Sequence, residues 1–77
     1  MIEKLIMLPP ERVSEFVNKA NRCDFDIDIA NEHKRKSKID AKSILGVMGL
    51  ELGNKLVVTY EGENEAFEKL LSELSAE

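Results

Sequence analysis

Hydrophobic and polar positions recur with two different periods along this chain, and the changes of period divide it into elements. Residues 2–8 form a short segment rich in Ile, Leu and Met that Pro9 and Pro10 end. This segment is too short for a stable helix, so it predicts a strand. In residues 11–23 the apolar side chains recur at i, i+3, i+4 and i+7, which predicts a helix with one buried face. These apolar positions are Val13, Phe16, Val17 and Ala20.

The period changes to two in residues 23–30, where apolar side chains alternate with aspartates. This alternation predicts a half-buried strand, with an acidic face formed by Asp24, Asp26 and Asp28. Residues 31–38 are polar and mostly basic, and predict a loop and the start of a second strand that ends near Ile39. We expect the two strands to form a hairpin with a long connection.

Three further elements follow. Residues 40–54 predict a short helix, with Asp40 and Ser43 as the two candidates for its N-cap and Gly53 after its end. Residues 55–60 are rich in β-branched side chains and predict a strand. Residues 61–77 turn at Gly62 and then predict a helix whose buried stripe is Phe67, Leu70, Leu71 and Leu74.

The resulting order is β-α-β-β-α-β-α. The hairpin interrupts the alternation of helices and strands, which argues against a purely parallel sheet. We therefore predict an α+β fold, with a four-stranded, mainly antiparallel sheet and the helices on one face. The 77 residues contain no linker or internal repeat, so we expect residues 1–77 to form a single domain.

Composition narrows the classes of function. The single cysteine, Cys23, excludes a disulfide within the chain and favours a reducing compartment, so we expect a cytoplasmic protein. No apolar run approaches the ~20 residues that span a bilayer, and we expect no membrane insertion. The formal net charge of −4 argues against nucleic acid as the main partner.

Few side chains suggest metal or catalytic chemistry. His33, the only histidine, lies in the basic loop, without a neighbouring group that would position it for catalysis. An EF-hand loop starting at Asp24 needs Gly at its sixth position and Glu at its twelfth, and these positions hold Ile29 and Arg35. We interpret Cys23 as a packed thiol. The sequence predicts no metal site and no cofactor.

Residues 40–49 contain four large apolar side chains interleaved with two glycines, Gly46 and Gly49. Each glycine costs a helix about 1 kcal/mol relative to alanine, so a helix that only fills the core would rarely contain both. Ile44 and Met48 are four residues apart and share a face, with Leu45 beside them, while Val47 points elsewhere. The pattern favours a short helix with a partly exposed apolar face and Val47 as its core contact.

Residues 42–53 of this chain, KSILGVMGLELG, resemble the region around the regulatory serine of HPr, the histidine-containing phosphocarrier of the sugar phosphotransferase system. Residues 15–29 resemble the first helix and second strand of that family. The element order is also similar to the family's open-faced β-sandwich, and the resemblance covers nearly the whole chain. It implies a function related to phosphoenolpyruvate-dependent sugar transport and its regulation.

The family's phosphorylated histidine lies in a His-Ala-Arg-Pro motif at the start of the first helix. Counted back without gaps, the histidine position falls at Pro9 and the arginine position at Glu11. Proline cannot accept a phosphate, Pro10 removes an N–H that the anion needs, and Glu11 adds a negative charge that Arg12 only partly offsets. The resemblance therefore implies a regulatory or docking relative that is not an enzyme, rather than a histidine phosphocarrier.

The resemblance also assigns expected roles to the short helix. It implies that Ser43 is a regulatory phosphorylation site and that Ile44, Leu45 and Met48 form a docking surface. The implied partners are phosphotransferase-system components, a serine kinase or a transcriptional regulator. Two alternatives stay open: an interaction module of this fold that is unrelated to sugar transport, and an active phosphocarrier that uses a non-standard residue such as His33.

Overall fold

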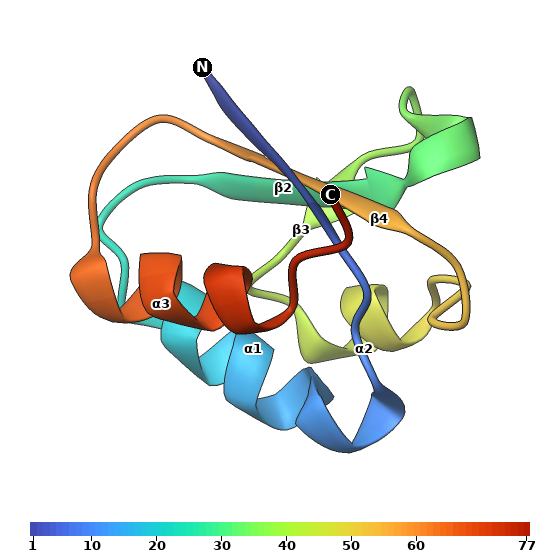
Figure 1. The fold of residues 1–77 in the computed structure, drawn as a ribbon, viewed down its shortest axis with the longest axis horizontal. Coiled ribbons are helices and arrows are strands. Elements are labelled where there is room, and N and C mark those ends of the chain that lie inside the picture. The colour runs from blue at the N-terminus through green and yellow to red at the C-terminus, as the bar shows by residue number, and fades with distance from the viewer.

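A computed structural model describes all residues 1–77 and places four strands in one sheet, with three helices covering one face (Figure 1). The predicted α+β class and element order are confirmed. The elements are β1 (Ile2–Ile6), α1 (Val13–Asn21), β2 (Ile27–Asn31), β3 (Ile39–Asp40), α2 (Ile44–Met48), β4 (Leu56–Tyr60) and α3 (Glu65–Glu73), with 3₁₀ turns η1 (Pro10–Arg12) and η2 (Glu32–Lys34).

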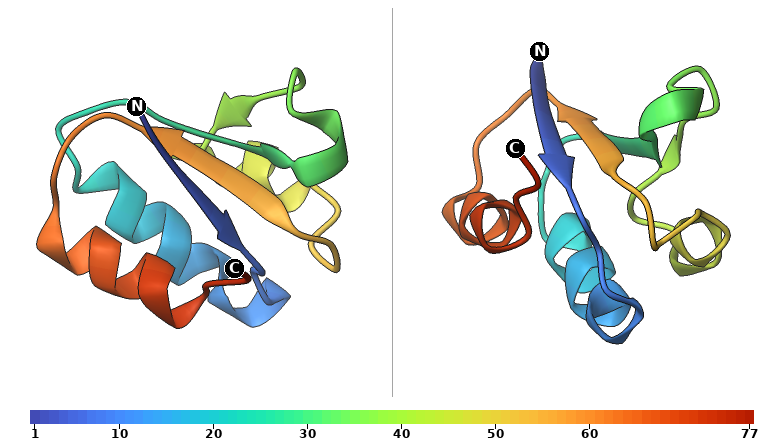
Figure 2. Two further views of the ribbon diagram at one scale, coloured as in Figure 1. Left: turned by 45° about the horizontal axis from the view of Figure 1, so that its top comes forward. Right: turned by 45° about the vertical axis from the view of Figure 1, so that its right-hand side comes forward.

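The sheet has the strand order β1-β4-β2-β3, and all three pairings are antiparallel. β4 lies between β1 and β2, so Val58 faces Lys4 on one side and Ile29 on the other. The end of the chain follows the outer edge of β1, where the Ala76 N–H donates to the Leu5 carbonyl at 2.8 Å. Figure 2 shows this C-terminal segment running alongside β1.

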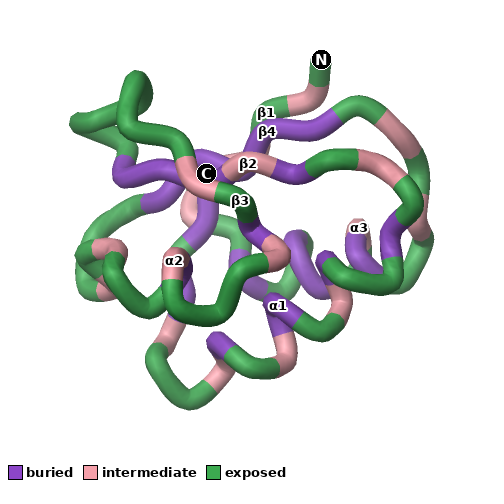
Figure 3. Tube along the Cα trace, turned by 180° about the vertical axis from the view of Figure 1, so that it is seen from behind, coloured by how far each residue is buried: buried purple, intermediate pink, exposed green.

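The core lies between the sheet and the helices. The predicted faces of α1 and α3 are both buried, and the rings of Phe16 and Phe67 meet across them with centroids 5.9 Å apart. Tyr60 of β4 meets Phe67 edge-on at 5.6 Å, which ties the sheet to the helix layer. Figure 3 shows the buried residues gathered where the strands face the helices. None of the helices is both long and apolar enough to cross a membrane.

The strand predicted for residues 23–30 is wrong in its first half, because β2 begins only at Ile27. The Cys23 N–H donates to the Ala20 carbonyl at 3.1 Å, so residue 23 still belongs to the turn that ends α1. Asp24 and Asp26 precede β2 and do not share a strand face with Asp28. Phe25 is half-buried and stacks on the ring of Tyr60, with centroids 5.8 Å apart.

Two other predicted boundaries also change. β1 ends at Ile6 rather than at residue 8, although Leu8 is buried. The helix predicted within residues 40–54 has only five residues and ends at Met48, with Gly49 rather than Gly53 after it. Asp40 is not its cap, because Asp40 lies in β3 and its carboxylate accepts a hydrogen bond from the Lys42 N–H at 2.9 Å.

Candidate functional site

Ser43 caps the N-terminus of α2. Its backbone is extended, and its hydroxyl oxygen accepts a hydrogen bond from the Gly46 N–H at 3.2 Å. A Cβ on Gly46 would lie 3.2 Å from Ile39 Cδ1 and 3.3 Å from Ser43 Oγ. Glycine at position 46 therefore lets α2 approach β3 closely while the cap forms. The Ser43 side chain is exposed to solvent.

The segment before Ser43 is held against α1 by two side chains that sequence reasoning missed. The Asn21 side-chain amide donates to the carbonyls of Val17 and Lys42, at 2.9 and 3.0 Å. Lys42 Nζ donates to the Cys23 carbonyl at 3.1 Å. Asn21 lies about 20 residues from Lys42 in the chain, so no local pattern could reveal these contacts.

The short helix exposes the three apolar side chains that we call the α2 patch: Ile44, Leu45 and Met48. Leu45 is 82% exposed, Met48 60% and Ile44 42%, whereas Val47 on the opposite side is fully buried. The prediction that Val47 is a core contact is confirmed. α2 packs against α1 and β3, which leaves the α2 patch facing solvent. Removing this apolar surface from water is favourable, so the patch is suited to contact with another molecule.

The entrance to α1 contains the positions predicted for the family histidine and arginine. Pro9 is extended and precedes η1, and its carbonyl accepts a hydrogen bond from the Arg12 N–H at 2.9 Å. Pro10 is the first residue of η1 and has no N–H to offer an anion. Glu11 is exposed to solvent and makes no ion pair. This corner therefore presents two prolines and a carboxylate.

Arg12 is the only cation in this corner, and two carboxylates already bind it. Arg12 Nε lies 2.9 Å from Glu15 Oε1, and Nη2 lies 2.8 Å from Glu73 Oε1. The hydrogen bonds to Glu15 and Glu73 raise the pKa of Arg12, and the bond from Arg12 lowers the pKa of Glu15. The guanidinium thus links α1 to the end of α3. The partial compensation expected of Arg12 would require breaking these contacts.

The other candidate side chains have structural surroundings. His33 is exposed in η2, and its Nε2 lies 3.3 Å from Glu51 Oε1. Cys23 is buried, and this burial raises the pKa of its thiol, which agrees with the interpretation of a packed side chain. Neither group lies beside Ser43 in the chain or shares a hydrogen bond with it.

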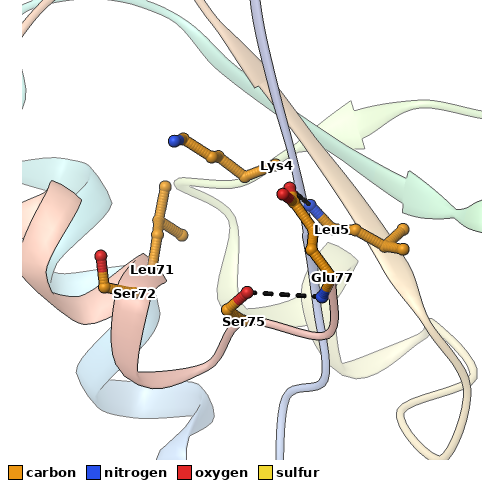
Figure 4. A pocket seen from close by; sticks show the side chains of 6 residues that line it. All are labelled: Lys4, Leu5, Leu71, Ser72, Ser75 and Glu77. Carbon is orange, nitrogen blue, oxygen red and sulfur yellow. Dashed lines mark hydrogen bonds between the residues drawn. The ribbon is translucent and has the colours of Figure 1, made fainter.

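A cavity of about 250 Å³ lies between β1 and the C-terminal segment. Figure 4 shows Lys4 and Leu5 projecting to opposite sides of β1, with Ser75 accepting a hydrogen bond from the Glu77 N–H at 3.3 Å. None of the residues predicted as a site lines this cavity. Its lining residues are Lys4, Leu5, Leu71, Ser72, Ser75 and Glu77.

Comparison with known proteins connects this geometry to one family. The family model described as "PTS HPr component phosphorylation site" matches residues 12–76, so the match begins after Pro9, Pro10 and Glu11. The solved phosphocarrier protein HPr from Bacillus anthracis is similar, with a TM-score of 0.73 and 28% identity over 96% of each chain. HPr-C-His from Thermoanaerobacter tengcongensis gives a TM-score of 0.72 and 26% identity, covering 95% of this chain and 89% of that one. A search of curated proteins found no match.

The fold defines a small α+β protein with an open antiparallel sheet and three helices on one side. The chain belongs to the HPr family, which is related to the sugar phosphotransferase system. HPr is a phosphocarrier rather than a classical enzyme, and proteins of the family interact with phosphotransferase components.

Proposed function

We propose that this HPr-family protein is a regulatory or docking protein and does not carry phosphate on histidine. The main support is the composition of the corner before α1. There Pro9, Pro10 and Glu11 precede Arg12, which is bound to two carboxylates. A phosphorylated side chain at a helix entrance is stabilised by backbone N–H groups and by a cation. Pro10 has no backbone N–H, and the cation Arg12 is already bound by Glu15 and Glu73.

The proposed docking surface is the α2 patch of Ile44, Leu45 and Met48. Its three side chains are exposed on a helix that Ser43, Asn21 and Lys42 hold in place. Methionine adapts its shape to different partners, which suits a surface that binds more than one protein. The proposed partners are phosphotransferase-system components or a transcriptional regulator, met in the cytoplasm by residues 1–77 acting as one domain.

Ser43 is the proposed switch for this surface. Its hydroxyl is exposed at the start of α2, next in sequence to Ile44. A phosphate on Ser43, added by a serine kinase, would place nearly two negative charges beside the α2 patch. An apolar partner surface would then have to desolvate those charges, so phosphorylation would change which partner binds.

Incubation with phosphoenolpyruvate and enzyme I tests the proposal. We expect the intact mass to stay unchanged, because no histidine precedes α1. A bona fide HPr in the same reaction serves as the positive control. Stoichiometric acid-labile phosphate on this chain would contradict the proposal, and its loss in His33→Ala would identify the protein as a carrier through His33.

A separate experiment tests Ser43. With a competent serine kinase and ATP, we expect the mass of one phosphate to be added to the wild type and none to Ser43→Ala. Ser72→Ala is the matched control, because Ser72 is an exposed serine on α3. Equal phosphorylation of Ser43→Ala and the wild type would exclude Ser43 as the site.

A further inference from the structure

The longest continuous exposed stretch of the molecule is residues 32–38, between β2 and β3, which we call the basic arm. Figure 3 shows it as an exposed projection beyond the sheet. The basic arm contains four of the eleven Lys and Arg residues and the only histidine, but only one of the fifteen acidic residues. It is therefore a locally positive surface on a chain with a net charge of −4.

The basic arm is held in place at several points. Arg35 Nη1 lies 3.2 Å from Glu3 Oε1, on the strand at the far edge of the sheet. His33 Nε2 and Lys34 Nζ lie 3.3 and 3.8 Å from the same oxygen of Glu51. The Glu32 N–H donates to the Lys55 carbonyl at 3.0 Å. The backbone hydrogen bond anchors the start of the arm, and its paired cations remain about half exposed.

Two lysines of the basic arm, Lys36 and Lys38, form no ion pair with the rest of the chain. The ion pairs that the arm does form all use carboxylates, and both partners of each pair are about half exposed. Exposed pairs of this kind contribute little to stability. Carboxylates of another molecule can therefore bind Lys36 and Lys38, and can replace Glu3 and Glu51 at little cost.

We propose that the basic arm binds an acidic segment of a partner polypeptide. Complementary charge of this kind speeds association and selects among partners. The proposal goes beyond the docking function of the α2 patch, because it concerns a different element. The arm is nevertheless connected to that side of the molecule through Glu51, which follows α2 in the chain.

Other polyanions fit the basic arm less well. It contains no aromatic side chain on which a nucleic-acid base could stack. The arm also contains no apolar side chain that could enter a lipid surface.

Titration of ¹⁵N-labelled protein with a hexaglutamate peptide tests the proposal. At about 20 mM NaCl we expect amide shifts concentrated in residues 32–38 and at Lys55, and we expect them to fade as salt screens the charges near 0.3 M. Single-stranded DNA and vesicles containing anionic lipid are titrated in parallel. The absence of shifts with millimolar peptide would overturn the proposal, as would tighter binding of DNA or vesicles.

Two double variants with equal net charge distinguish the effect of the basic arm on peptide binding from the effect of overall charge. Lys36→Glu with Lys38→Glu should abolish the peptide-induced shifts, whereas Lys19→Glu with Lys69→Glu, on α1 and α3, should retain them. Equal loss in both variants would overturn the proposal, because binding would then follow net charge alone. Met48→Asp should bind the peptide like the wild type. Peptide binding by the basic arm is therefore tested independently of the docking function proposed for the α2 patch.

Discussion

Gly62 is the one residue with a positive φ, 153°, and it lies in the turn between β4 and α3. The ring of Phe25 packs where a side chain at position 62 would begin, since a Cβ there would lie 2.6 Å from Phe25 Cγ. Phe25 also stacks on Tyr60, the last residue of β4. One contact between two residues thus joins the turn before β2 to the turn after β4.

Replacing Gly62 by alanine should lower the free energy of unfolding by about 2 kcal/mol, because it combines backbone strain with an overlap that Phe25 must relieve. Urea unfolding followed by circular dichroism measures the change. Gly53→Ala is the matched control, since a Cβ at position 53 has no neighbouring atom within 4 Å. Equal unfolding midpoints for the two variants would show that the Phe25 packing is not as described.

The cap at Ser43 predicts a second change at a single position. Ser43→Ala should cost about 1 kcal/mol of stability, because the Gly46 N–H loses its acceptor. Ser43→Asp should stay close to the wild type, since aspartate caps as well as serine. Thermal melts of the two variants measure the difference, and Ser72→Ala on α3 should leave the melting temperature unchanged. Equal melting of Ser43→Ala and the wild type would exclude the cap as a source of stability.

At the scale of the elements, α2 has two contrasting sides, since Leu45 is exposed and Val47 is fully buried. Leu45→Asp and Met48→Asp should therefore leave the fold intact, whereas Val47→Asp should unfold the chain because it buries an unpaired charge. Circular dichroism and urea unfolding compare the three variants. Loss of folding in Met48→Asp would show that Met48 belongs to the core instead of the α2 patch.

The long helices could be predicted from sequence because their patterns reflect one-sided burial, whereas β4 was predicted from its β-branched residues and is buried along its whole length. Val13, Phe16, Val17 and Ala20 recur with the helical period and are all buried. The alternation in residues 23–30 led to a wrong prediction. Phe25 lies outside β2, and its ring is half-buried because it packs against Gly62 and stacks on Tyr60. Side-chain period alone does not distinguish these two reasons for burial.

The site residues could be predicted only where their contacts are with residues close in the sequence. Ser43 and Gly46 are three residues apart, so the cap follows from local sequence. The contacts of Asn21 with Lys42 and of Arg12 with Glu73 join residues 21 and 61 positions apart. Contacts between residues so far apart leave no periodic pattern in the sequence. The binding of Arg12 by Glu15 and Glu73 can therefore be recognised only from the structure.

For the molecule as a whole, the buried groups Tyr60 and Cys23 predict the response to alkali. Burial and the hydrogen bond from Tyr60 to Glu68 raise the pKa of Tyr60, and burial raises the pKa of Cys23. Both groups are neutral when protonated, so the folded chain keeps protons that the unfolded chain releases. Stability should be complete below pH about 9 and fall as the pH rises further.

Urea unfolding at a series of pH values between about 7 and 11 measures this fall. Tyr60→Phe should be less stable than the wild type at neutral pH, because Glu68 loses the phenol that donates to it at 2.5 Å. The same variant should show a shallower loss of stability in alkali, because Cys23 alone then contributes. A slope unchanged by Tyr60→Phe would refute the role of the phenol.

The position of β1 also determines when the protein can fold. β1 pairs only with β4, more than fifty residues later, and its outer edge is completed by the Leu5 carbonyl accepting from Ala76. A chain emerging from the ribosome therefore carries an unpaired first strand until β4, residues 56–60, has also emerged. Contacts of such long sequence separation slow folding. Until β4 is available for pairing, the nascent chain exposes Ile2, Leu5 and Ile6 to chaperones and to other chains.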